Sequence, residues 1–387
     1  MKHKTIFIAL ILIVGFLTWR FIRPMNIFVV SEAFELPMQT QDAPPMFPTL
    51  RAEECAVCHK AIYDEWSTTI HSQAWTDPYY QVDWIFDGSQ QICHNCHIPL
   101  DRQQEYKVLG FHDAQKWNPI LEPNPAFDPQ LQTQGVTCLA CHLHNGKIVG
   151  VIGDTNAPHP VEKINNPNQM CVRCHVVPGD RWDTFYRFPP CGTVTEIQES
   201  RGESLIEKIA KLDCVNCHMP VVERTVTLGG KTRSVRSHLW RGGHDPEMVK
   251  KGLTITLQKT PSTKNDNLNY VLALTNTGAA HYLPTGTPDR HLTVHLRVLD
   301  ASKNGLAEKK HTLKRYVIWR PFIVDLWDTR LKFGQSREFN IEVPADGKYI
   351  EAEVRYHLLD EARRKRINYK NQDPINYSVY RRTLQVR

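Results

Sequence analysis

The chain of 387 residues has no cysteine among its first 54 residues and none after Cys217. The N-terminal absence excludes a lipid anchor attached to a cysteine near the start of the chain. A clear signal-cleavage site is also lacking, because the nearest small-x-small tripeptide, Ser31-Glu32-Ala33, lies downstream of Arg20 and Arg23. These absences leave the fate of the N-terminal segment open.

That segment is the one long apolar run in the chain. Lys2 and Lys4 form a positive start, and residues 5–19 are apolar apart from one glycine and two threonines. Fifteen residues match the apolar core of a signal peptide, whereas a membrane span needs about 20, which Phe21 and Ile22 help to supply. We expect residues 1–30 to be an uncleaved membrane anchor, with a cleaved signal as the alternative. Both interpretations export the rest of the chain.

Ten of the eleven cysteines fall in five copies of Cys-x-x-Cys-His. This is the attachment signature of a c-type haem: two thiols form thioethers to one porphyrin, and the histidine ligates its iron. The sequence therefore predicts five covalently attached haem c groups. The predicted attachment residues are Cys55, Cys58, Cys93, Cys96, Cys138, Cys141, Cys171, Cys174, Cys214 and Cys217, and the predicted proximal ligands are His59, His97, His142, His175 and His218.

Other uses of paired cysteines fit poorly. Zinc ribbons use an even number of pairs and need no histidine after each one. Thioredoxin-type motifs lie in βαβ units, and no such pattern surrounds these pairs. Iron–sulfur clusters need four cysteines close together, whereas these pairs are well separated along the chain.

The other side of each iron needs a second ligand, and the sequence holds 18 histidines. Two histidines per iron favour a low-spin centre suited to electron transfer, so we expect bis-histidine ligation; a methionine partner such as Met170, Met219 or Met248 is the less favoured alternative. The predicted distal ligands are His71, His112, His159, His238 and His244. Weaker candidates are His94 and His144, which lie close to their own motifs, and His281, in a loop of the C-terminal part.

Cys191, in Pro-Pro-Cys-Gly, belongs to no motif. It is predicted to be a buried inert thiol, with an intermolecular disulfide and a reactive or ligating thiolate as alternatives.

The chain divides by composition into four segments. Residues 31–50 hold four prolines and read as an extended linker. Residues 51–249 carry all five motifs and few helical patterns, at 62–66 and 196–212, so we expect an irregular, short-helix cytochrome c domain. Residues 250–387 predict an antiparallel β-sandwich of immunoglobulin-like type. Its expected strands are 253–257, 270–274, 292–298, 316–318, 339–343, 350–354 and 377–386. The predicted fold class is therefore α+β and multidomain, with an N-terminal anchor.

Charge differs between these parts. From residue 251 on, 24 basic residues stand against 14 acidic ones, whereas the first 250 residues hold 23 against 27. The simple interpretation is surface solvation and docking of the two domains; the functional one is a face for an acidic partner or an anionic substrate. No binding of nucleic acid is expected, and the oligomeric state is left open.

Several segments resemble a known family. Cys55-Ala-Val-Cys58-His59 followed by Trp66-Ser67 and His71 is similar to the first haem segment of multihaem cytochromes related to the nitrifier tetrahaem electron carrier. The segments 135–142, 214–220, 242–245, 276–281 and 284–286 resemble later parts of larger, pentahaem members with a C-terminal β-domain. The resemblance covers roughly residues 51–300. It implies stacked haem pairs, mostly bis-histidine ligation, a periplasmic electron-transfer role, and a distal ligand at His71.

The expected function is a membrane-anchored periplasmic electron carrier in a respiratory or extracellular electron-transfer chain. Its expected partners are redox proteins, or membrane quinol and a respiratory complex, and the N-terminal segment is expected to hold it at the membrane. The alternative is an oxidoreductase acting on a small nitrogen or sulfur oxyanion at one open haem. The carrier is favoured because every motif ends in histidine, without the lysine variant of one nitrite-reductase class, and because enough histidines exist to close every iron.

Overall fold

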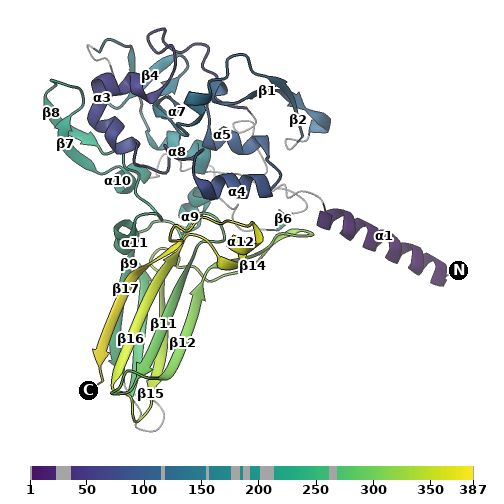
Figure 1. Ribbon diagram of the computed structural model, residues 1–387, viewed down its shortest axis with the longest axis vertical. Helices are drawn as coiled ribbons and strands as arrows, with labels where there is room; N and C mark the ends of the chain where they lie inside the picture. The colour runs from purple at the N-terminus through teal and green to yellow at the C-terminus, as the bar shows by residue number, and fades with distance from the viewer. Residues whose placement is uncertain are drawn as a thin grey trace.

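The computed structural model describes residues 2–22, 36–114, 118–153, 157–175, 184–185, 192–200, 213–260 and 268–386. A cysteine-bearing part of short helices lies above a set of long antiparallel strands, and the N-terminal helix projects from the junction between them (Figure 1). That helix, α1 (Lys2–Ile22), contains a stretch, His3–Ile22, that is long and apolar enough to cross a membrane. Its apolar side chains are mostly exposed.

The cysteine-bearing part is built from short helices and hairpins. Four motifs each lie within one α-helix, and the second begins at the end of a 3-10 turn and continues into the helix that follows. One helical turn brings two cysteines three residues apart onto one side. The helices are α3 (Ala52–Trp66), α4 (Pro78–Phe86), α5 (His94–His97), α6 (Pro129–Gln132), α7 (Cys138–His142), α8 (Asn168–His175), α9 (Thr193–Ser200) and α10 (Cys214–His218), with 3-10 turns η1 (Gln91–Cys93), η2 (Asp101–Gln103) and η3 (His112–Ala114). The strands are β1 (Tyr106–Phe111), β2 (Pro119–Pro123), β3 (Leu143–His144), β4 (Lys147–Gly150), β5 (Val161–Lys163), β6 (Thr184–Phe185), β7 (Val221–Thr225) and β8 (Thr232–Arg236).

Local sequence explains where these helices begin. The Asp77 carboxylate accepts hydrogen bonds from the backbone N–H groups of Tyr79 and Tyr80, and Pro78 occupies the first helical position of α4. Asp128 caps α6 in the same way, before Pro129. The predicted helix at 62–66 is the end of α3. The predicted helix at 196–212 overlaps α9, and its residues 201–212 lie outside the described residues.

Conventional core is scarce in this part. One cluster consists of Phe47, Leu50, Leu100, Leu131, Leu139 and Leu143, and a second of Val194 and Ile197. Residues 36–50, predicted as an extended linker, pack here because Phe47 and Leu50 bury their side chains and the Thr40 hydroxyl donates a hydrogen bond to Asp101.

The C-terminal part has two antiparallel sheets that share one core. One has the strand order β15-β10-β9 and the other β12-β11-β16-β17. Alternate residues of β10 and β16 are buried, as expected for strands with one inward face. The elements are α11 (Pro246–Gly252), β9 (Leu253–Thr260), β10 (Leu268–Asn276), β11 (His291–Leu299), β12 (Gly305–Leu313), β13 (Arg315–Ile318), β14 (Ile323–Asp328), β15 (Ser336–Val343), β16 (Tyr349–His357), α12 (Glu361–Arg366) and β17 (Asn376–Gln385).

All seven expected strands are present, and the sequence analysis missed β12 and β14. Strand β12 lies at a sheet edge and is mostly exposed, so its sequence carries several charges in place of clear alternation. Strand β14 belongs to a third sheet, β13-β14-β6, in which it pairs with the cysteine-bearing part through β6.

Two buried arginines join the two parts. Arg330 forms an ion pair of 2.6 Å with Glu196 of α9, and Arg363 of α12 pairs with Asp83 at 2.5 Å and Asp87 at 3.3 Å. These contacts fix the sheets against one side of the cysteine-bearing part, where the candidate site lies.

Candidate haem-binding site

A large cavity runs through the cysteine-bearing part. Its volume is about 2050 Å³, whereas ordinary small-molecule pockets measure about 300–1,000 Å³. All ten motif cysteines and all five motif histidines line it. Five further histidines line it as well, namely His71, His159, His238, His244 and His281.

Most motif histidines are oriented by the backbone. Nδ1 lies at hydrogen-bond distance from a carbonyl oxygen in His59 (Val226, 2.9 Å), His97 (Ala74, 2.7 Å), His142 (Val149, 2.8 Å) and His218 (Arg241, 2.7 Å). Because a carbonyl only accepts, each Nδ1 carries the proton and Nε2 keeps its lone pair. A metal-binding histidine typically donates its other ring N–H to a carbonyl or carboxylate in this way. His238 and His281 make the same contact, to Arg236 and Tyr282.

Burial keeps four of the cavity histidines neutral. It lowers the pKa of His71, His97, His238 and His281 to about 4, and for three of them neighbouring imidazoles lower it further: His175 and His218 beside His71, His142 beside His238, and His218 beside His281. At pH 7 the rings are therefore uncharged, which is the form that binds iron.

Eight of the ten cavity histidines form four pairs. Their ring centroids are 6.3 Å apart for His59 and His159, 6.3 Å for His71 and His175, 6.2 Å for His142 and His238, and 6.4 Å for His218 and His281. With about 2 Å from iron to nitrogen and about 1.1 Å from nitrogen to ring centre, two imidazoles on one iron have centroids about 6.2 Å apart. Each pair consists of one motif histidine and one histidine from elsewhere in the chain, so the side chains fit four irons with two histidines each.

The second motif, which ends in His97, differs from the other four. Among the described residues, the ring in contact with His97 is the phenol of Tyr80, stacked at 3.7 Å with an angle of 11° between the ring planes. The Tyr80 hydroxyl is buried and has no hydrogen-bond partner in the part of the chain that the structure describes. Burial raises the pKa of Tyr80, so the phenol stays protonated. His244 is the other cavity histidine outside the four pairs. Burial lowers its pKa, and the nearby charge of Arg290 lowers it further.

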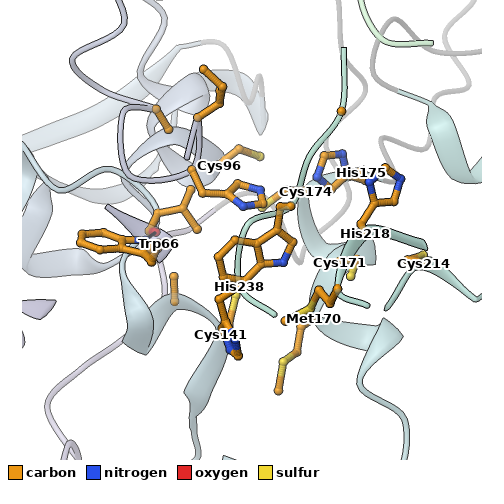
Figure 2. Close-up of a pocket in the computed structure, with 18 of the residues that line it drawn as sticks. Trp66, Cys96, Cys141, Met170, Cys171, Cys174, His175, Cys214, His218 and His238 are labelled. Carbon is orange, nitrogen blue, oxygen red and sulfur yellow. Dashed lines mark hydrogen bonds between the residues drawn. The ribbon is translucent and has the colours of Figure 1, made fainter. Parts of the chain in front are cut away.

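Thiols of different motifs lie beside one another. Hydrogen bonds join Cys55 with Cys138, Cys96 with Cys174, and Cys171 with Cys214, and Cys141 lies near Cys174. Figure 2 shows Cys96 beside Cys174, with His175 and His218 close together. Numbered along the chain, the first motif therefore contacts the third, the third contacts the fourth, and the fourth contacts the fifth. The second motif also contacts the fourth.

Trp240 separates two of the histidine pairs. Its indole lies edge-on to His71 at 5.2 Å and to His238 at 5.1 Å. The two histidines belong to different pairs, so Trp240 packs between those pairs. The sequence analysis did not single out this residue.

The remaining sequence candidates lie elsewhere. His112 is exposed in η3 and does not line the cavity, because its segment belongs to the β1–β2 hairpin; its role as an iron ligand stays a prediction without this support. His94 and His144 do not line the cavity either, and His94 packs against Trp75 and Trp84. Cys191 lies outside the described residues.

His281, a weaker candidate in the sequence analysis, lies in the cavity beside the motif histidine His218. It comes from the loop between β10 and β11 and reaches the cavity from the sheet-bearing part. The available sequence signal was its surrounding motif, Ala280-His281-Tyr282, in a loop expected to face the cysteine-bearing part.

No protein-family model and no curated protein matches the chain. Among solved structures, a penta-heme cytochrome c552 from Thermochromatium tepidum is similar, with 20% identity over 87% of this chain and 98% of that one and a TM-score of 0.63. The putative ApaA protein from Bordetella pertussis (14% identity, 34% of this chain and 89% of that one) and the structural genomics target SoR45 (10%, 36% and 89%) both give a TM-score of 0.18, too low to indicate a shared fold. The chain thus shares its fold with the cytochrome c552 over most of its length.

Proposed function

We propose that the chain is a pentahaem c-type cytochrome that relays electrons among covalently attached haems. The observation that carries the proposal is the set of four histidine pairs at the spacing of two imidazoles on one iron, each including a motif histidine. The similar solved structure is titled a penta-heme cytochrome, which agrees with five Cys-x-x-Cys-His motifs here. Haem supplies the one-electron chemistry; the protein's residues hold, orient and space it.

The spacing of the attachment points supports a relay. Thiols of neighbouring motifs are within hydrogen-bond contact, so porphyrins attached to them lie side by side. The imidazoles of His142 and His238, which are neutral and oriented by backbone carbonyls, would hold one iron from two histidines, and such a pair would favour low-spin iron and small structural change on electron transfer. The covalent thioethers prevent loss of the groups.

We also propose a location and an architecture. Helix α1 fits a membrane anchor that places the cavity on the periplasmic side, with a redox protein or membrane quinol and a respiratory complex as partner. The strand orders β15-β10-β9 and β12-β11-β16-β17 support an immunoglobulin-like sandwich for the C-terminal part.

The relay is tested by stopped-flow reduction of the oxidised holoprotein with a substoichiometric one-electron donor. We expect the electrons to distribute over the haems within the mixing time, so that later spectra change only in amplitude as more donor is added. Haems that reduce in separate slow phases would contradict a relay.

One observation favours a second candidate, an oxidoreductase that binds a small nitrogen or sulfur oxyanion at the haem of His97. This histidine has no second imidazole at ligation distance among the described residues, and His244 and Arg290 line the same cavity as a hydrogen-bonding imidazole and a cation. Nitrite, hydroxylamine or sulfite would then shift the optical spectrum of one haem per chain, and Arg290→Gln would weaken that binding. If His244 closes on the iron, no added ligand shifts the spectrum until His244→Ala is introduced.

A further inference from the structure

The loop between β13 and β14 is in contact with the end of α1. Arg320 Nη1 donates a hydrogen bond of 2.9 Å to the carbonyl oxygen of Phe21, and Arg20 Nε donates one of 3.2 Å to the carbonyl of Pro321. The Phe322 ring lies 6.4 Å from the Phe16 ring and packs under the Arg20 guanidinium. Four side chains and two reciprocal hydrogen bonds therefore attach this loop to the last two turns of the helix.

The β13–β14 hairpin exposes large apolar side chains beside that contact. Trp327 is 55% exposed, Leu326 45% and Ile318 41%. Leu326 lies at the register shift of the ribbon, opposite Tyr316 and Val317, so the exposed Leu326 and Trp327 follow each other on the bulged strand. Phe333, shortly after the hairpin, is exposed as well. Apolar residues grouped in this way mark an interaction surface more often than isolated ones do.

The position of the hairpin along α1 indicates what covers it. Lys2 and Lys4 lie at one end of the helix and Arg20 at the other, so the orientation follows from the proposed export of the cysteine-bearing part, which leaves Lys2 and Lys4 on the cytoplasmic side. The opposite end, with Trp19 and Ile22, then lies at the outer membrane–water interface, where tryptophan and tyrosine are enriched. The hairpin contacts this end and carries Tyr316 and Trp327, whose rings are 4.8 Å apart, with Lys314 over Tyr316.

The same loop reaches the cavity. Trp319, next to Arg320, lines it, and β14 pairs with β6 of the cysteine-bearing part through Ile323 and Val324. A short loop thus has one end in the lining of the candidate haem cavity and the other on the terminal turn of α1.

We propose that the β13–β14 hairpin, residues 315–328, is a second membrane contact. It lies in the outer interface of the bilayer that α1 crosses, and so holds one side of the haem cavity at the membrane surface. The exposed apolar side chains of this hairpin contact the lipids of the bilayer. The proposal rests on the membrane anchoring proposed above and adds the orientation of the redox part, which would bring the Trp319 side of the cavity towards lipid-soluble or membrane-bound electron donors.

The test places the photoreactive amino acid p-benzoylphenylalanine at position 327 of the full-length holoprotein, in liposomes of phosphatidylethanolamine and phosphatidylglycerol. The matched control carries it at position 306, where Leu306 of β12 is also exposed (39%) on the same part of the molecule. After irradiation, mass spectrometry should find phospholipid adducts at 327 and none above background at 306. In the Arg320→Ala, Phe322→Ala background, adducts at 327 should fall several-fold, because the contact that aligns the hairpin with α1 is weakened.

Flotation of the same samples on a density gradient separates the two proposals. Protein that floats with the liposomes but gives equal or no lipid adducts at the two positions overturns the membrane contact and leaves the anchor intact. Adducts at 327 to a second protein chain assign the hairpin to a protein interface and also overturn it. Protein that does not float overturns the anchor and the hairpin contact together, while the electron relay is judged separately by the stopped-flow result.

Discussion

At the scale of single residues, the site depends on imidazole rings whose two nitrogens have different partners. A backbone carbonyl holds the Nδ1 proton of His142 and His238, and Nε2 of each ring is left for iron. The Cys-x-x-Cys-His spacing is enough to predict the motif side of each pair, since it is a local signal. The distal partner comes from a remote segment, so the sequence could nominate His71, His159 and His238 but could not assign them to irons. His281 and Trp240 needed the fold, because only packing brings them to the cavity.

The pairing of His142 with His238 predicts the effect of one substitution. In His238→Ala, the haem of the third motif loses its distal ligand, and one haem per chain becomes high-spin. Resonance Raman spin-state marker bands measure this. His295→Ala is the control, because His295 lies on the outside of β11 with Glu308 at 2.8 Å, and it should leave all bands unchanged. His112→Ala should also leave the marker bands unchanged. A new high-spin haem in His112→Ala would support the sequence-based prediction that His112 is a distal iron ligand.

Asp289 predicts a pH dependence of stability. Burial raises the pKa of this carboxyl to about 6, although Arg363 opposes the rise. Because the folded state holds the proton more tightly than the unfolded one, this contribution is fully present below about pH 4 and is lost as the pH rises through about 6. The loss is about 2 kcal/mol after allowance for partial solvent screening.

Asp289→Asn should remove this fall in the free energy of unfolding between pH 4 and pH 7, as measured by guanidinium unfolding at a series of pH values. Asp346→Asn, in an exposed turn between β15 and β16, is the control and should retain it. An equal fall in wild type and Asp289→Asn would place the titration in another group.

At the scale of elements, periodic strands were predictable and irregular ones were not. Strand β16 alternates buried and half-buried residues along its whole length, so its pattern gives the strand directly. Strand β12 is polar because it forms an edge, and β14 is short and interrupted by a register shift opposite Tyr316 and Val317. The short helices of the cysteine-bearing part show little hydrophobic periodicity in their sequences, because many of their apolar side chains line the cavity and do not pack into a core.

Helix α12 makes a testable contact with α4. The buried Arg363 guanidinium pairs with Asp83 and Asp87, so Arg363→Gln leaves two carboxylates without their cation and should lower the free energy of unfolding by about 2 kcal/mol. Lys365→Gln makes the same charge change on the exposed side of α12 and should cost less than about 0.5 kcal/mol. Guanidinium unfolding followed by circular dichroism compares them; equal effects would mean that the ion pairs do not hold the helices together.

At the scale of the whole molecule, the charge contrast predicted from the sequence has a structural counterpart. Basic residues of the C-terminal part meet acidic residues of the cysteine-bearing part at Arg363 with Asp83 and at Arg330 with Glu196. The simpler interpretation, docking of the two parts, thus accounts for some of the difference in charge between them. The specific partners could not be predicted, because each joins residues more than 130 positions apart, which only the assembled fold brings together.

The central claim, five haems with four held by histidine pairs, is tested most directly by electron paramagnetic resonance and near-infrared spectra of the oxidised holoprotein. The haem content is counted by pyridine haemochrome on the same sample. The account predicts five haems per chain, at least four of them low-spin with bis-histidine signatures, and any high-spin signal limited to the haem of His97. Fewer than four haems per chain, or high-spin signals from two or more, would contradict it.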